Sequence, residues 1–383
     1  MMRFLRTCLA AAVSTLAMGQ AFAEEEFVPE KITVEERIKP GPNVFTVDQS
    51  WTGASRINVV GAGELDRKGN LSVGLVTQFV LTKDKKTAYT ASAYAKRITY
   101  GPTEAVLQEF DVDTMSVKRE IIVSPKMAQV APQKSLLALS ADEKYAFVQN
   151  ATPATSVSVV DLAAGKEIAE VPTPGCWSIH PALSGIQFST LCGDGTLQTF
   201  TVGADGKFAA PSKSEKIFDA DTDPLYVVGE RAGDKLVFVS FNGNIYTISD
   251  KDGTAKLVDK FSITEGVEGA WAPGGVEVIA YNEANDVLFV TMHPDAREGS
   301  HKDAATEIWP VDMKAKKVLY RSAVEGVKSI AVTQGKTPTL FALNDDEGIL
   351  TRYAVDPEAK FAAKMTGKLE DMGSFAPLVY AGE

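Results

Sequence analysis

The chain has 383 residues, of which 45% are hydrophobic and 23% are charged, and its formal net charge is −11 at pH 7. This length is ample for a large hydrophobic core, and the excess of carboxylates argues against nucleic acid or anionic lipid as a partner. The charge therefore excludes partner classes without identifying a function.

The first 23 residues have the pattern of a secretory signal peptide. Two arginines precede an apolar run over residues 9–18, and Ala21, Phe22 and Ala23 form a small-x-small cleavage pattern. No other stretch approaches the roughly 18 continuous apolar residues that a membrane span needs. We therefore expect removal of residues 1–23 and export of the mature chain to the periplasm of a bacterium.

An acidic N-terminal arm, residues 24–42, is expected to follow the signal peptide. It contains the best helical candidate of the mature chain, the short stretch TVEERIK at Thr33 to Lys39, just before Pro40 and Pro42. No long amphipathic helix is predicted anywhere else. We expect residues 43–383 to form one domain.

The mature chain repeats a unit of short strands. Apolar runs, each preceded by a polar turn, recur at a spacing of roughly 50 residues, which is the length of one propeller repeat. These runs begin at Leu81, Leu139, Ala232, Asn282 and Thr333, with one double-length gap that contains a similar strand pair. Residues 156–171 and 307–322 are typical of second hairpins within such units.

The repeats predict an all-β, seven-bladed β-propeller. Six units and a further segment over residues 45–73 account for the seven blades, and four short strands per unit are typical of this fold. A two-domain α/β fold would need a helical pattern between successive strands, and the sequence has none.

Cys176 and Cys192 are the cysteines that remain after removal of residues 1–23. An oxidising compartment favours a disulfide, and closing a loop of about 16 residues stabilises a protein by roughly 3 kcal/mol. A zinc site would need four ligands, but only His180 lies nearby, and a nucleophile would need a free thiol. We therefore predict that the two cysteines form a disulfide.

The stretch MHPDAREGSHKDAATEIW, residues 292–309, contains two of the three histidines. His293, Asp295, Glu298 and His301 carry nitrogen and oxygen atoms that a metal would accept, and an autonomous metal-dependent hydrolase would use the two histidines. The same composition is also typical of a long polar loop whose side chains hydrogen-bond one another. We favour the loop and predict no metal site.

The sequence contains no complete motif of a known catalytic site. GxSxG, HExxH, a P-loop and a GxGxxG after a strand are all absent. Aspartate pairs such as Asp345 with Asp346 lie in predicted turns, where aspartate is common. The residues therefore indicate either a periplasmic scaffold that binds a ligand or protein, or the non-catalytic partner of an enzyme.

Four stretches, taken in order, resemble the large (heavy) subunit of the tryptophan tryptophylquinone amine dehydrogenases. The most specific is GCWSIHPALSGIQFSTLCGDG, residues 175–195, and the others are residues 94–111, 148–165 and 292–309. The chain resembles the aromatic amine branch more than the methylamine branch. These motifs lie in irregular loops that unrelated propellers do not share, and the resemblance covers nearly the whole mature chain.

The resemblance implies that the propeller pairs with a small, disulfide-rich light subunit in an α2β2 heterotetramer. The tryptophan tryptophylquinone and the catalytic aspartate base would belong to the light subunit, so this chain would contain no catalytic residue and no cofactor. Enzymes of this family convert primary amines to aldehyde and ammonia and pass single electrons to a small copper protein or cytochrome. The large subunit contributes one wall of the substrate channel.

Trp51 is the residue of this chain that the resemblance places in the channel. The family has an aromatic side chain shortly after an aspartate at the end of the first strand, and Trp51 lies three residues beyond Asp48. Family members have phenylalanine there, so the larger indole would narrow or reshape the channel. In a second interpretation, Trp51 lies on the propeller face or at an interface without contacting substrate.

Overall fold

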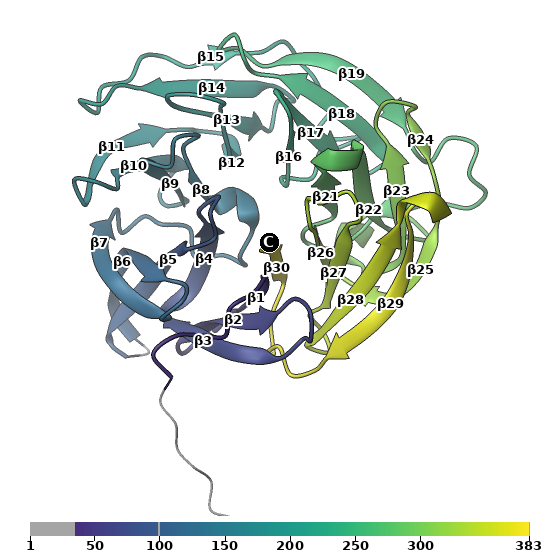
Figure 1. Cartoon of the computed structure of the whole chain (residues 1–383). Helices are drawn as coiled ribbons and strands as arrows, with labels where there is room; N and C mark the ends of the chain where they lie inside the picture. The colour runs from purple at the N-terminus through teal and green to yellow at the C-terminus, as the bar shows by residue number, and fades with distance from the viewer. Residues whose placement is uncertain (1–34, 99, 383) are drawn as a thin grey trace, which may run out of the picture. The chain divides into compact units, whose positions relative to one another are not determined.

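The computed structural model describes residues 35–98 and 100–382 and contains seven antiparallel sheets around a central axis (Figure 1). The chain divides into two units, Met1–Glu36 and Arg37–Glu383, and all the sheets belong to the second. The predicted signal peptide and residues 24–34 of the predicted arm lie outside the described residues. Each sheet is one blade, so the predicted seven-bladed β-propeller is confirmed.

Blades 1 to 4 are described here from the innermost strand outward. Blade 1 consists of β30 (Leu378–Ala381), β1 (Asn43–Asp48), β2 (Ser55–Gly61) and β3 (Arg67–Val73). Blade 2 consists of β4 (Leu75–Leu81), β5 (Thr87–Arg97), β6 (Tyr100–Asp111) and β7 (Ser116–Val123). Blade 3 consists of β8 (Leu137–Leu139), β9 (Tyr145–Asn150), β10 (Ser156–Asp161) and β11 (Lys166–Pro172). Blade 4 consists of β12 (Cys176–Pro181), β13 (Ile186–Cys192), β14 (Leu197–Val202) and β15 (Ser212–Lys213).

Blades 5 to 7 complete the ring. Blade 5 consists of β16 (Glu230–Ala232), β17 (Lys235–Val239), β18 (Asn244–Ser249) and β19 (Lys256–Ser262). In blade 6, β20 (Ala272–Pro273) and β21 (Ile279–Asn282) pair with β22 (Val287–His293), followed by β23 (Ala305–Asp312), which pairs with β24 (Lys317–Val318) and β25 (Ser322–Val327). Blade 7 consists of β26 (Ser329–Val332), β27 (Thr339–Asn344), β28 (Ile349–Asp356) and β29 (Ala362–Leu369). The helices of the described chain are short 3₁₀ turns: η1 (Lys134–Leu136), η2 (Glu283–Asn285), η3 (Ser300–Lys302) and η4 (Pro357–Ala359).

The blades bury side chains on both faces because each packs against two neighbours. Along β9, Phe147 packs against blade 4, whereas Ala146 and Val148 on the other face pack against blade 2. Successive side chains of a strand point to opposite faces, so both sets are apolar. Seven hydrophobic clusters fill the seven junctions between blades. This arrangement explains why the repeats appear as short apolar runs rather than as strict alternation.

The turn between β10 and β11 shows why the hairpins follow an aspartate. The side chain of Asp161 accepts a hydrogen bond of 2.8 Å from the Ala164 N–H, and its carbonyl accepts one of 2.9 Å from the Gly165 N–H. Gly165 has a φ of +64°, which glycine adopts without steric cost. The hairpin predicted over residues 156–171 is therefore confirmed.

The ring is closed by pairing between the two ends of the domain. β30 pairs with β1 in antiparallel register, with Val44 opposite Ala381 and Val47 opposite Leu378. Blade 1 therefore combines the last strand of the chain with the first three. The apolar clusters on either side of blade 1 depend on this pairing, because both contain residues of β1 and β30.

The short helix considered over residues 33–39 is absent from the part that the structure describes, residues 35–39. The Ile38 N–H donates a 2.7 Å hydrogen bond to the Asp113 carbonyl, and the Ile38 side chain packs on the cluster between blades 1 and 2. A helix would require this N–H to bond four residues back along the chain. The helical expectation was therefore wrong for these residues.

A backbone N–H and a side chain from opposite sides of the ring meet at the axis. The backbone N–H of Lys134, in blade 3, donates a 2.8 Å hydrogen bond to Oε1 of Glu277, which precedes β21 in blade 6. The Lys134 ammonium lies 3.4 Å from the Ile330 carbonyl and 5.3 Å from the centre of the Tyr380 ring. We call the Lys134–Glu277 contact the axial bridge, since it spans the centre of the propeller.

Burial strongly perturbs the carboxyl group of the axial bridge. The side chain of Glu277 is fully buried, and its Oε2 has no hydrogen-bond partner among the described residues. Burial raises the pKa of Glu277 to about 7, against the opposing effects of the Lys134 charge and N–H, and the nearby charge of Glu230 adds to the rise. Burial also raises the pKa of Glu230.

Replacing Glu277 should change how stability depends on pH. Folded Glu277 keeps its proton up to about pH 7, whereas an unfolded glutamate loses it near the ordinary value of 4.5. The stability from this group is therefore present below pH 4.5 and lost as the pH rises through 7. From pH 5 to pH 8, the free energy of unfolding of the Glu277→Gln variant should rise by up to about 3 kcal/mol relative to that of the wild type.

Urea unfolding at pH 5 and at pH 8 measures this difference. The Glu347→Gln variant serves as a matched control, because the Glu347 side chain is exposed. Because other titrating groups are common to all three proteins, their contributions cancel in the comparison. A Glu277→Gln variant whose stability relative to the wild type is the same at pH 5 and 8 would contradict the pKa shift.

The disulfide predicted between Cys176 and Cys192 is present. Cys176 begins β12 and Cys192 ends β13, and the two residues face each other in the sheet ladder of blade 4. Both cysteines are buried. The bond therefore ties the two innermost strands of this blade together at one end.

Removing the disulfide should lower the free energy of unfolding by roughly 3 kcal/mol, because the unfolded chain regains the entropy of the open loop. We expect the Cys176→Ser/Cys192→Ser variant to show this loss in urea unfolding. Wild-type protein under reducing conditions should behave like the variant. If full reduction left the urea midpoint of the wild type unchanged, the disulfide would not contribute to stability.

Candidate functional site

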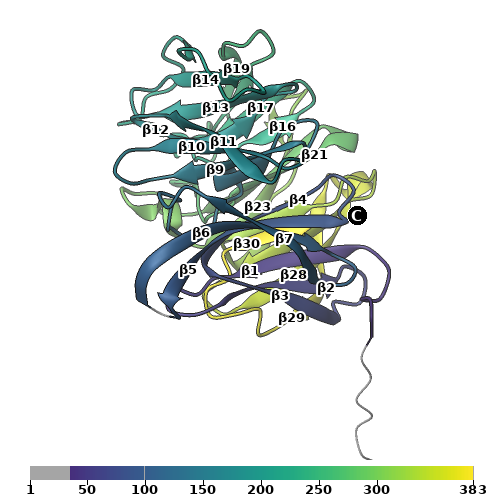
Figure 2. The same cartoon turned by 90° about the vertical axis from the view of Figure 1, so that its left-hand side faces the viewer.

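One face of the ring collects the connections that could form a site. Because neighbouring strands run in opposite directions, the connections into the innermost strands lie on the same face as those between the second and third strands. They include residues 49–54 after β1, 294–304 after β22 and 370–377 before β30. We call this face the cavity face; the last strand, β30, ends at the opposite face, on the right in Figure 2.

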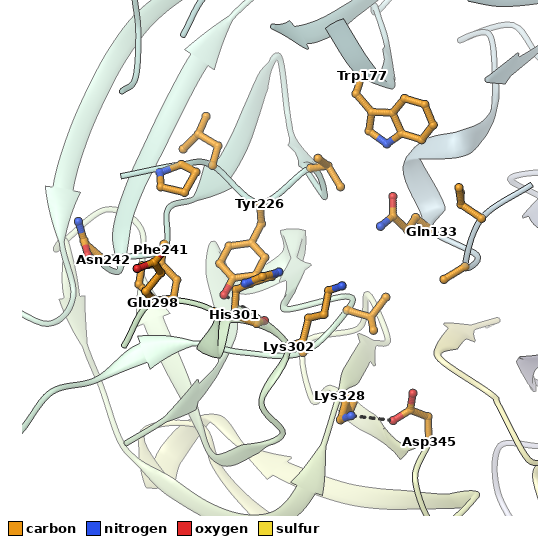
Figure 3. A pocket seen from close by; sticks show the side chains of 18 of the residues that line it. Gln133, Trp177, Tyr226, Phe241, Asn242, Glu298, His301, Lys302, Lys328 and Asp345 are labelled. Atoms are coloured by element: carbon orange, nitrogen blue, oxygen red, sulfur yellow. Dashed lines mark hydrogen bonds and ion pairs between the residues drawn. The ribbon is translucent and has the colours of Figure 1, made fainter. Parts of the chain in front are cut away.

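A cavity of about 1080 Å³ opens on this face. Its lining comes from the connections of six blades, so it surrounds the axis of the ring. The labelled side chains in Figure 3 are those of Gln133, Trp177, Tyr226, Phe241, Asn242, Glu298, His301, Lys302, Lys328 and Asp345. Gln133 and Val276, which directly precede the two residues of the axial bridge, also belong to the lining. The bridge therefore lies next to the inner end of the cavity.

Tyr226 fixes one wall of the cavity. It lies in the connection that leads into β16, and its hydroxyl donates a hydrogen bond to the Pro273 carbonyl of blade 6. A second contact, 3.4 Å long, reaches the carbonyl of His301. Burial raises the pKa of Tyr226, and the charge of Asp303 acts in the same direction. The phenol therefore stays neutral and holds blades 5 and 6 together at the cavity.

A lysine and two aspartates form the wall that blade 7 contributes. The Lys328 ammonium lies 3.6 Å from Asp345 and 3.1 Å from Asp346, and Figure 3 shows the contact with Asp345. Burial lowers the pKa of Lys328, but the hydrogen bond to Asp346 and the charges of both carboxylates outweigh it and leave that pKa raised. Burial raises the pKa of Asp345 despite the nearby lysine. Asp345 and Asp346 lie in the turn that the sequence predicted, and in addition they pair with Lys328 at the cavity.

Trp51 lies beside the cavity on the same face. Its side chain is 52% exposed, and its ring centre is 6.2 Å from that of Phe375, which lines the cavity. The preceding strand is anchored by Asp48, whose carboxylate accepts a 2.5 Å contact from Arg56. Trp51 is thus accessible for contact with a ligand or a partner, while its role in a substrate channel stays a prediction.

The residues of the candidate metal site do not converge. The His293 side chain is buried and its Nδ1 lies 2.7 Å from the Pro294 carbonyl, whereas His301 is exposed at the cavity. The loop instead bonds to itself: Arg297 pairs with Asp303 at 2.9 Å, and the Arg297 N–H donates to the Ser300 hydroxyl. The interpretation as a self-bonded polar loop is confirmed. Over residues 35–98 and 100–382, no group of three or more potential metal ligands comes together.

Most cavity residues were not identified as functional from the sequence. Trp177 and Lys302 lie in stretches that carry the family resemblance, residues 175–195 and 292–309. The sequence nevertheless indicated no individual role for them or for Gln133, Tyr226 and Lys328. They share a position in or near the connections between strands, where polar residues are expected in any propeller. For Gln133, Tyr226 and Lys328 the available signal is their place before an innermost strand, which topology brings to the axis; Lys302 lies instead in the connection between β22 and β23 on the same face. Within the described part of the chain, no helix is long and apolar enough to cross a membrane.

Comparison with known proteins identifies the family of the chain. The family model described as methylamine dehydrogenase heavy chain matches residues 43–381. The methylamine dehydrogenase heavy chain of Methylobacillus flagellatus is 26% identical over 310 residues, covering 80% of this chain and 76% of that protein. The heavy chain of Methylorubrum extorquens is 27% identical over 360 residues, covering 91% of this chain and 83% of that protein.

Solved structures support the fold. The periplasmic gluconolactonase of Pseudomonas aeruginosa superimposes with a TM-score of 0.62 at 15% identity, covering 89% of this chain and 99% of that chain. At this level of identity the likeness concerns the propeller and not the activity. The sequence matches confirm the resemblance to heavy subunits, whereas the closer likeness to the aromatic amine branch stays a prediction. The chain belongs to the methylamine dehydrogenase heavy chain family.

Proposed function

We propose that this chain is the large, non-catalytic subunit of a periplasmic quinoprotein amine dehydrogenase. The observation that carries the proposal is the family match over residues 43–381, which spans all seven blades. In this proposal the small light subunit supplies the tryptophan tryptophylquinone and the catalytic base, and two copies of each subunit form an α2β2 heterotetramer. A small copper protein or cytochrome accepts the electrons.

The periplasmic location rests on the N-terminal sequence and the disulfide. Residues 1–23 have the arginines, apolar run and cleavage pattern of a signal peptide. The Cys176–Cys192 bond supports the same compartment, since disulfides persist in oxidising environments.

Trp271 and Trp309, whose rings are in contact, are suited to packing and not to forming a quinone. Trp271 and Trp309 are neighbours, with ring centres 5.4 Å apart, but Trp309 is fully buried. The guanidinium of Arg321 lies over both rings, 4.3 Å from the centre of Trp271 and 4.7 Å from that of Trp309. A quinone needs access to substrate, which a fully buried indole does not have. This arrangement favours a quinone on the partner subunit.

The cavity face is the surface that we assign to the light subunit. It carries Trp51, the position at which the family has an aromatic residue in the substrate channel, and the exposed indole is free to contact a partner. We further propose that the substrate is a primary aromatic amine, as the likeness to the aromatic branch suggests. The alternative, a periplasmic scaffold without redox chemistry, predicts no such partner.

The assembled enzyme should have activity that the isolated chain lacks. We expect the chain alone to show no quinone absorption and no amine oxidation, and co-expression with its light subunit to yield both. Assays with methylamine, phenylethylamine and tyramine and an artificial electron acceptor measure this difference. Amine oxidation by the isolated chain would contradict the proposal, and failure to form any complex with a light subunit would favour the scaffold.

Replacing Trp51 should change which amines the assembled enzyme prefers. If the indole lines the channel, Trp51→Ala widens it and shifts relative kcat/KM values among small and aromatic amines by about 10-fold to 200-fold. Because the side chain is half exposed, the loss of stability should be well below the roughly 3 to 5 kcal/mol of a buried tryptophan.

Tyr320→Ala provides a matched control, since Tyr320 is a similarly exposed aromatic residue, 47% accessible, between β24 and β25. We expect this variant to keep the wild-type ranking of amines. A Trp51→Ala enzyme that assembles normally and also keeps that ranking would remove Trp51 from the substrate path.

A further inference from the structure

One corner of the cavity presents polar groups that no other residue satisfies. Figure 3 shows Lys302, Gln133 and Trp177 pointing into the cavity from three sides. The Lys302 ammonium and the Trp177 indole N–H have no hydrogen-bond or ion-pair partner among the described residues. The side-chain amide of Gln133 has no hydrogen-bond partner there either: its Oε1, an acceptor, is buried, and its Nε2 is the group that can donate to a ligand. Lys302 is exposed and Trp177 is half-buried, so these groups face the open cavity, where a ligand or water satisfies them.

The charge of this corner matches a single negative charge. Lys302 is the uncompensated cation, because the other lysine of the lining, Lys328, is already paired with Asp345 and Asp346. An ammonium, an indole N–H and a side-chain amide can together donate hydrogen bonds to the two oxygens of a carboxylate. A second negative charge on the ligand would find no second unpaired lysine in the lining.

Asp221 and Glu298, the acidic residues of the lining other than the paired Asp345, lie at the other end. In the view of Figure 3, Glu298, Phe241 and Asn242 lie on the far side of Tyr226 from Gln133 and Trp177. Asn242 in turn donates a 3.1 Å hydrogen bond to the Thr222 carbonyl, which places the loop of Asp221 at that end too. The cavity is therefore polarised, with its free cation away from its free carboxylates.

The walls around the donors suit an apolar body. The lining of the cavity also includes Val130, Ala131, Val227, Val276 and Tyr226. A volume of about 1080 Å³ is much larger than a carboxylate group alone and is in the range of small-molecule sites. Aromatic rings pack well against such a mixture of valine side chains, tryptophan and tyrosine.

We propose that this corner binds an organic monocarboxylate with an aromatic or aliphatic body, with Lys302, Trp177 and Gln133 as its donors. The carboxylate belongs either to a free small acid or to an acidic side chain or C-terminus of the light subunit. The donors all belong to this chain, so the site can be tested on the isolated chain; only the light subunit as a source of the carboxylate rests on the proposed function.

The first experiment titrates the full mature chain with phenylacetate in a calorimeter. We expect saturable binding with a dissociation constant on the order of 1 mM, and at least about 10-fold weaker binding of the neutral phenylacetamide and the cationic 2-phenylethylamine. Lys302→Met should weaken phenylacetate binding by about 10-fold or more, and Trp177→Phe, which keeps a ring but removes the N–H, by a few-fold. Lys336→Met, at an exposed lysine between β26 and β27, should change nothing.

The second experiment identifies the source of the carboxylate by repeating the titration on the complex with the light subunit. If the free acid is the ligand, phenylacetate still binds to the complex, and Lys302→Met leaves subunit association unchanged. If the partner supplies the carboxylate, phenylacetate competes with the light subunit, and Lys302→Met weakens association.

Two results would overturn the proposal. One is binding of 2-phenylethylamine to the isolated chain as tight as that of phenylacetate. The other is a Lys302→Met variant with unchanged phenylacetate binding and unchanged subunit association. Without a light subunit that assembles, the first experiment still decides, so failure of the proposed function and failure of this site are distinguishable.

Discussion

Pairing of β30 with β1 is the interaction on which the rest of the structure depends. It joins residues 44–47 to residues 378–381, almost the full length of the domain apart. Each blade is stable only between two neighbours, because its strands are apolar on both faces. Opening this junction would expose the clusters on both sides of blade 1. The closed ring is what holds the innermost strands, and the connections that lead into them, around one axis.

The cavity is a direct consequence of that geometry. Its lining residues are scattered between Val130 and Phe375 in the sequence, yet the ring brings them together because each precedes or follows a strand on the same face. The axial bridge of Lys134 and Glu277 crosses the centre beneath them. Trp51 lies at the rim, packed against Phe375. One face of this heavy chain therefore combines a hollow, an unpaired cation and an exposed indole.

The sequence predicted the fold far better than the site, for physical reasons. Blades are local units, so turns such as Asp161 to Gly165 and runs such as β9 are visible in short stretches, and the disulfide joins near neighbours. The cavity residues meet only after ring closure. Glu277 shows no local signal, since its significance depends on burial against Lys134 from the opposite side. Asp345 lies in a turn as predicted, but its pairing with Lys328 was not visible because Lys328 belongs to another connection.

In the proposed enzyme, the cavity face of this heavy chain receives the light subunit. Hydrogen–deuterium exchange on the chain before and after assembly tests it most directly. After assembly we expect slower exchange than in the isolated chain in residues 49–54, 221–227 and 294–304 of the cavity face. Exchange in residues 333–338, between β26 and β27 at the opposite face, should be unchanged. Protection confined to residues 333–338 and other loops of the opposite face would show that the light subunit does not bind at the cavity face.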